Sequence, residues 1–179
     1  MMPIGALMVE HRWIERVIED VRLRLGEQSS RSPIDSGYVN KVIDFLRIYA
    51  ERCHYGKEED ILFRDLAEKN LEPPLRDMMG QLVADHAWAR AATGRLDAAN
   101  ASLAAGHRAS LEEVRRLLGD LAAFYPEHMQ REDKVFFRPA MTHLSEDEQA
   151  GMLEAFMKFD AALIHEKYRQ VVHDLERER

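Results

Sequence analysis

The chain has 179 residues, of which 25 are basic and 32 acidic, and its formal net charge is −7. This length is enough for one domain with a sizeable apolar core, and the dispersion of the basic residues among acids disfavours nucleic acid as a partner. The one cysteine, Cys53, excludes an intramolecular disulfide framework and a cysteine-rich metal site. Without a signal-peptide pattern or a long apolar run, we expect a soluble, cytoplasmic protein with no membrane partner.

Apolar residues recur at spacings of three and four along five stretches, which predicts an all-α protein. Four of these stripes run over residues 7–25, 43–61, 75–96 and 118–135, with Val135 as the last inward residue. They predict an up-down four-helix bundle within residues 1–140. Ser145 and Glu148 form a capping box for an additional C-terminal helix over residues 145–176. Its stripe is predicted to contain Leu153, Met157, Ala161, Ile164, Tyr168, Val171 and Leu175.

Two His-x-x-x-Glu pairs lie on the second and fourth stripes: His54 with Glu58, and His128 with Glu132. On an α-helix, side chains four residues apart lie on the same face at roughly 5–6 Å, so each pair offers an imidazole and a carboxylate to one point. A single histidine precedes each pair, His11 by 43 residues and His86 by 42. The order is therefore His, His-x-x-x-Glu, repeated once.

Neighbouring positions support an internal duplication. At an offset of 75 residues, Glu10-His11-Arg12-Trp13 falls on Asp85-His86-Ala87-Trp88, so both tryptophans stand two residues after a histidine. At an offset of 74, Ile61-Leu62-Phe63-Arg64 falls on Val135-Phe136-Phe137-Arg138. Two copies of a helical hairpin predict a four-helix bundle and not a solenoid, which needs at least three repeats.

The four histidines and two glutamates all occupy inward positions, and no Lys or Arg shares their stripes at the same level. A buried, unpaired carboxylate costs several kcal/mol unless a cation or another partner compensates it, so the pattern predicts a shared metal site. Imidazole and carboxylate without thiolate suit iron or manganese, and two carboxylates able to bridge suggest two ions.

This motif set resembles the hemerythrin-like (HHE cation-binding) proteins from His11 to about Pro139. The resemblance implies a non-heme di-iron pair bridged by an oxo or hydroxo group and by two carboxylates, here Glu58 and Glu132, with the histidines divided between the irons. On this basis we favour two iron ions over manganese or zinc. Asp133 also fits the family spacing after His128 and remains the alternative to Glu132. The oxygen carriers of the family have a second histidine on the third helix, which is missing beside His86. An extra open position suits reactivity more than oxygen carriage.

Two further residues are candidates for contact with the cofactor or its ligand. Tyr125, one turn before His128, is predicted to line the pocket or to pack in the core. His165 on the C-terminal helix is predicted to supply a fifth imidazole or to lie at an interface. We expect the first half of that helix to cover its own bundle and the second half to contact a partner, such as a second copy in a homodimer.

The sequence therefore predicts a protein that binds or reacts with O₂, NO or peroxide, in sensing, storage or the response to oxidative or nitrosative stress. One alternative is the repair of iron–sulfur clusters or donation of iron. The repair proteins resemble this ligand order but carry an additional N-terminal cysteine-containing domain, whereas the first helix here is expected almost at Met1. A second alternative is an enzyme that degrades peroxide, and a third is a non-catalytic sensor whose C-terminal helix contacts a partner.

Overall fold

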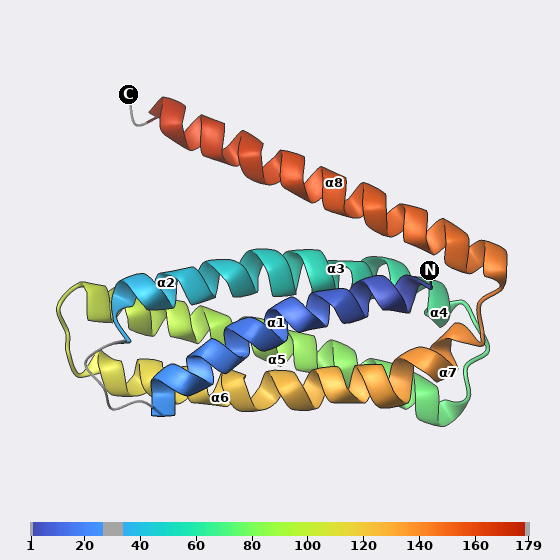
Figure 1. Ribbon diagram of the computed structural model, residues 1–179, viewed down its shortest axis with the longest axis horizontal. Coiled ribbons are helices and arrows are strands. Elements are labelled where there is room, and N and C mark those ends of the chain that lie inside the picture. The colour runs from blue at the N-terminus through green and yellow to red at the C-terminus, as the bar shows by residue number, and fades with distance from the viewer. Residues whose placement is uncertain (1, 27–33, 178–179) are drawn as a thin grey trace.

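The architecture is a bundle of helical rods with one further helix outside it (Figure 1). The computed structural model describes all residues except 1, 27–33 and 178–179, and no side chain from residue 165 onward. All regular structure of the described residues is helical, which confirms the predicted all-α class.

Four rods make up the bundle, and two of them change between α-helical and π-helical turns without a break. The first rod is α1 (Pro3–Gly26) and the third is α5 (Pro73–Ala104). The second rod consists of α2 (Ser36–Phe45), the π-helical η1 (Leu46–His54), α3 (Tyr55–Lys57), the π-helical η2 (Glu58–Phe63) and α4 (Arg64–Ala67). The fourth consists of α6 (Ser110–Arg131), the π-helical η3 (Glu132–Phe136) and α7 (Phe137–Met141).

Local sequence explains where the rods begin. Asp35 caps α2, since its side chain accepts a hydrogen bond from the backbone N–H of Tyr38 at 2.8 Å. Pro73 and Pro74 open α5, where a missing backbone N–H has no cost. Successive rods run in opposite directions (Figure 1), with α1 packed on α6, α2 on α5, and α5 on α6. None of the described helices combines the length and apolar character required to cross a membrane.

The core is divided into two apolar clusters by a polar layer at the height of the histidines. On α1, Leu7 belongs to one cluster and Ile14 to the other, and His11 lies between them. On α5, His86 separates Leu82 from Ala89 in the same way. The polar layer is therefore enclosed by apolar side chains along the bundle axis, which keeps water away from it.

A π-helical segment begins at the glutamate of each ligand pair, and on the fourth rod it changes which residues face the core. Both η2 and η3 begin at the glutamate of a His-x-x-x-Glu pair, Glu58 or Glu132. A π-helical turn contains more residues than an α-helical one, so it rotates the residues that follow. Val135, which the 3.6-residue period predicts inward, is consequently 49% exposed, whereas Phe136 is fully buried. The prediction for Val135 was wrong for this reason.

The helix α8 (Glu146–Arg177) begins at the predicted capping box. The backbone N–H of Ser145 donates to Glu148 at 2.9 Å, and the N–H of Glu148 donates to the Ser145 hydroxyl at 3.2 Å. The helix packs on the bundle through its first turns and then runs away from it (Figure 1).

The buried face of α8 differs from the predicted stripe by one residue. Met152 and Phe156 are each 2% exposed, whereas Met157 and Ile164 are 60% and 56% exposed. Two apolar stripes lie side by side on this helix, and periodicity alone does not tell which of them meets the bundle. The predicted stripe continues at Tyr168, Val171 and Leu175, whose side chains lie outside the described residues.

Candidate metal centre

The six predicted ligands come together from four rods in the polar layer. One histidine comes from α1, one from α5, and a histidine and a glutamate from each of the second and fourth rods. All six side chains are buried, with exposures of 1% or less: His11, His54, Glu58, His86, His128 and Glu132. Side chains that are far apart in the sequence are thus held in one enclosed volume.

The imidazoles form two pairs. Nε2 of His11 lies 3.0 Å from Nε2 of His54, and Nε2 of His86 lies 3.1 Å from Nε2 of His128. Two nitrogen ligands that are each about 2.1 Å from one ion and at right angles to each other are about 3.0 Å apart. Each pair therefore has the spacing expected for two neighbouring ligands of a single ion.

Both glutamates lie between the two pairs. Glu58 directs Oε1 to His54 at 3.5 Å and Oε2 to His86 at 3.3 Å. Glu132 directs Oε2 to His11 at 3.3 Å and Oε1 to His128 at 3.0 Å. Each carboxylate thus presents one oxygen to each pair, the arrangement in which a carboxylate bridges two ions.

The donor set fits two cations better than any other occupant. The outer nitrogen, Nδ1, of each imidazole contacts a carboxylate and must donate to it, so in a neutral ring Nε2 carries a lone pair directed at the centre. All four oxygens of Glu58 and Glu132 are buried without a hydrogen-bond partner. A buried group of lone pairs with no donor is strongly unfavourable unless cations lie between them.

The pKa values of the imidazoles also indicate that the buried carboxylates of this layer need positive charge beside them. Burial by itself lowers the pKa of His11, but hydrogen bonding to Asp133 and the nearby Glu132 outweigh it and raise the pKa to about 10. In His86, burial is likewise outweighed, by the nearby carboxylates of Glu132 and Glu58 and by the hydrogen bond to Glu59, and the pKa rises to about 11. A metal ion replaces the proton that these rings would otherwise hold.

Four outer carboxylates orient the imidazole rings, and sequence analysis did not assign them this role. Each stands next to a ligand in the chain but contacts the histidine of another rod. The contacts to Nδ1 are Asp133 to His11 at 2.9 Å, Glu10 to His54 at 3.0 Å, Glu59 to His86 at 2.7 Å and Asp85 to His128 at 3.2 Å. The alignment of Glu10 with Asp85 in the duplicated sequence was the available signal.

Cations support three of these outer carboxylates. Arg90 donates two hydrogen bonds to Glu59, at 2.9 and 3.0 Å, and Arg131 contacts Asp85. Lys57 contacts Glu10 and is itself 1% exposed. Lys57 does not belong to the predicted inward stripe of the second rod. Its ammonium contacts Glu10 and lies outside the group of six candidate ligands.

The remaining candidate residues are placed differently. Asp133 contacts the outer nitrogen of His11, while Glu132 occupies the centre. Tyr125 is fully buried, and its hydroxyl lies close to Tyr55. Tyr55, which the sequence did not single out, stacks on His86 with ring centroids 3.7 Å apart. The side chain of His165 lies outside the described residues.

A third group of metal-ligand types, Glu10, Cys53 and Asp160, does not form a comparable site. The ammonium of Lys57 already contacts both carboxylates, at 2.8 Å for Asp160. Burial raises the pKa of the Cys53 thiol to about 12, so the sulfur remains protonated at neutral pH. Lys57 supplies the positive charge that this group requires.

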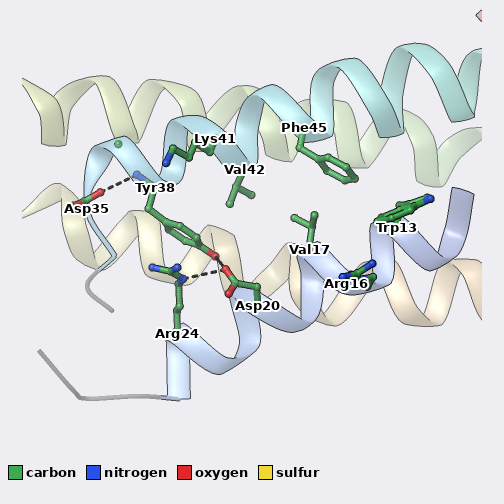
Figure 2. A pocket seen from close by; sticks show the side chains of 11 residues that line it. Trp13, Arg16, Val17, Asp20, Arg24, Asp35, Tyr38, Lys41, Val42 and Phe45 are labelled. Carbon is green, nitrogen blue, oxygen red and sulfur yellow. Dashed lines mark hydrogen bonds and ion pairs between the residues drawn. The ribbon is translucent and has the colours of Figure 1, made fainter. Parts of the chain in front are cut away.

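A large cavity between α1 and α2, about 940 Å³, is separate from the histidine layer. Figure 2 shows three of its polar side chains in contact: Arg24 and the Tyr38 hydroxyl both donate to Asp20, at 3.0 Å each. It contains none of the six candidate ligands. We therefore take the enclosed histidine layer, and not this cavity, as the candidate metal centre.

The family model of the hemerythrin HHE cation-binding domain matches residues 2–140 and, in a second match, residues 77–177. The first match covers most of the chain and contains all six candidate ligands, so the chain belongs to this family. The second match overlaps the first and starts near the beginning of α5, as an internally duplicated bundle allows. No curated protein and no solved structure matches the chain.

Proposed function

We propose that this hemerythrin-family cation-binding domain holds two iron ions and binds or reacts with O₂, NO or peroxide in sensing, storage or a stress response. The observation that carries the proposal is the position of Glu58 and Glu132, each with one oxygen toward each histidine pair. The resemblance to hemerythrins supports iron, and imidazole with carboxylate, without thiolate, suits it.

The protein residues leave room for a small ligand. His11 and His54 would give one ion two nitrogens, and the two glutamates would each add one oxygen. Because iron commonly takes about six ligands in octahedral geometry, positions remain open on both ions. Bound iron supplies redox chemistry and binding of diatomic molecules or peroxide at those positions.

The surrounding residues restrict what reaches the centre. The two apolar clusters close the layer along the bundle axis, and Tyr55 covers one face of the His86 ring at a centroid distance of 3.7 Å. A ligand of two atoms fits such an enclosed site, whereas a large organic substrate does not. The outer carboxylates hold all four rings in fixed orientations, so the ligand set is organised before an ion binds.

Metal analysis and an optical spectrum of protein purified in air test this proposal. We expect two irons per chain and the near-ultraviolet absorption of a ferric pair. Separate exposure of the reduced protein to O₂ and NO, and of the oxidised protein to peroxide, then identifies the ligand through spectral change. Catalytic loss of peroxide indicates the enzyme, and reversible binding of O₂ the carrier. A protein that takes up no iron, or only one ion per chain, contradicts the proposal.

A further inference from the structure

The contacts that orient the His54 ring extend to α8. Among the described side chains, the contacts that orient the other three candidate histidines come from the bundle itself. Glu10 accepts from Nδ1 of His54 at 3.0 Å and contacts Lys57 through its other oxygen. The Lys57 ammonium also donates to Asp160 of α8, with distances of 2.8 and 3.0 Å to the two carboxylate oxygens. A continuous series of charged contacts therefore connects the outermost helix to one candidate ligand.

The same part of α8 packs tightly on the backbone between His54 and Glu58. A Cβ atom placed on Gly56 would lie 2.6 Å from Cζ of Phe159, which is closer than side-chain carbons approach. Only glycine permits this contact without a shift of the ring. One residue further along each segment, Lys57 meets Asp160, so the apolar contact and the ion pair form together.

The attachment of α8 is local. Beyond Asp160, Ala161 and Ala162 are exposed, and the helix runs away from the bundle (Figure 1). Cavities of about 400 and 310 Å³ lie on either side of the contact, the first next to Phe159 and the second next to Asp160. The Asp160 carboxylate is thus placed on Lys57 by the turn of α8 that contains Phe156 and Phe159.

We propose that Asp160 and Lys57 are positioning residues, and that docking of α8 controls how tightly the His11–His54 half of the centre retains its ion. The inference rests on the proposed two-ion function. Lys57 is 1% exposed, and its charge is compensated by two carboxylates. When α8 detaches, Asp160 leaves, Lys57 is held by Glu10 alone, and Glu10 no longer has a fixed position from which to orient His54.

The effect is confined to one half of the centre because, among the side chains that the structure describes, α8 forms no hydrogen bond or ion pair with the residues that orient His11, His86 and His128. Arg90 on α5 holds Glu59 against His86, and Arg131 at the end of α6 contacts the partner of His128. The structure thus makes retention of one ion dependent on α8 and retention of the other independent of it. A partner that pulls α8 away would release one ion first.

Release of Co²⁺ from the fully loaded protein to excess chelator tests this directly, because visible absorption reports each bound ion. The variant is Asp160→Asn, which keeps the shape of the side chain and removes its charge, and the matched control is Asp147→Asn on the exposed first turn of α8. A second pair is Gly56→Ala, which displaces Phe159, with Gly80→Ala, where an added Cβ meets nothing within 4 Å.

We expect one of the two ions to leave about tenfold faster, or more, in Asp160→Asn and in Gly56→Ala, while the other leaves at the wild-type rate. Asp160→Glu should restore slow release, and both controls should match wild type. Equal acceleration of both ions, or no acceleration, overturns the coupling. A wild-type protein that takes up fewer than two irons overturns the proposed function itself, which is a separate and distinguishable result.

Discussion

Replacing Glu132 by glutamine removes one negative charge from the middle of the centre with little change in volume. Its two oxygens face both imidazole pairs, with distances of 3.3 Å to His11 and 3.0 Å to His128. The neighbouring Asp133 contacts only the outer nitrogen of His11, at 2.9 Å. Glu132→Gln should therefore lower the affinity for both ions, whereas Asp133→Asn should lower the affinity only for the ion held by His11.

The size of the effect follows from linkage between metal binding and folding. An ion present at 100 times its dissociation constant stabilises the folded state by about 2.7 kcal/mol, so two ions contribute about 5 kcal/mol. In a chain of this length, 1 kcal/mol shifts the melting temperature by about 2–4 °C, which gives roughly 10–20 °C between metal-loaded and metal-free wild type. Asp133→Asn, with a roughly 10- to 100-fold loss of affinity at one ion, should reduce that difference by roughly 3–10 °C.

Calorimetry of metal-loaded and metal-free samples measures, for each variant, the difference in melting temperature that the metal causes. Metal analysis of the same samples gives the number of bound ions. Comparing each variant with its own metal-free form cancels any effect of the substitution on the fold. In Glu132→Gln the metal content should fall to one ion or none, and the difference in melting temperature should fall to half of the wild-type value or less. If Glu132→Gln keeps two ions and the full difference while Asp133→Asn loses both, the assignment along the fourth rod is wrong by one residue.

Three other predictions concern pH, packing and the metal bridge. In the metal-free protein, His11 and His86 have pKa values raised from 6.5 to about 10 and 11, so their stabilisation is complete below pH 6.5 and is lost as the pH rises through those values. Urea titrations should show a falling free energy of unfolding over this range, and a flat profile would contradict the charged contacts. Phe136→Ala should cost about 3–5 kcal/mol of stability, and Val135→Ala less than about 1 kcal/mol, in the same titrations; the reverse order would place Val135 in the core. Glu58→Ala should lower the metal content to one iron or none, and retention of two irons would exclude it as a bridge.

Local periodicity was sufficient to predict the helical bundle and the inward position of the six candidate ligands. Residues three and four apart share one face of an α-helix whatever surrounds it, so the stripes that contain His11 and His86 follow from the order of residues alone. The duplication added an independent comparison between the two halves. The capping box of Ser145 and Glu148 was predictable for the same reason, since its two hydrogen bonds join residues only three apart.

Only the tertiary structure decided which residues meet across rods. Glu10 stands beside His11 in the chain but orients His54, because the crossing of α1 with the second rod, and not sequence distance, brings these side chains together. The face that α8 presents was undetermined for a similar reason, since two apolar stripes satisfy the same period. The π-helical turn after Glu132 places Phe136 inward instead of Val135, and a helical period taken as constant along the chain does not include such a local change. Periodicity describes one helix at a time, whereas contacts between helices depend on their crossing and on the space that each side chain finds there.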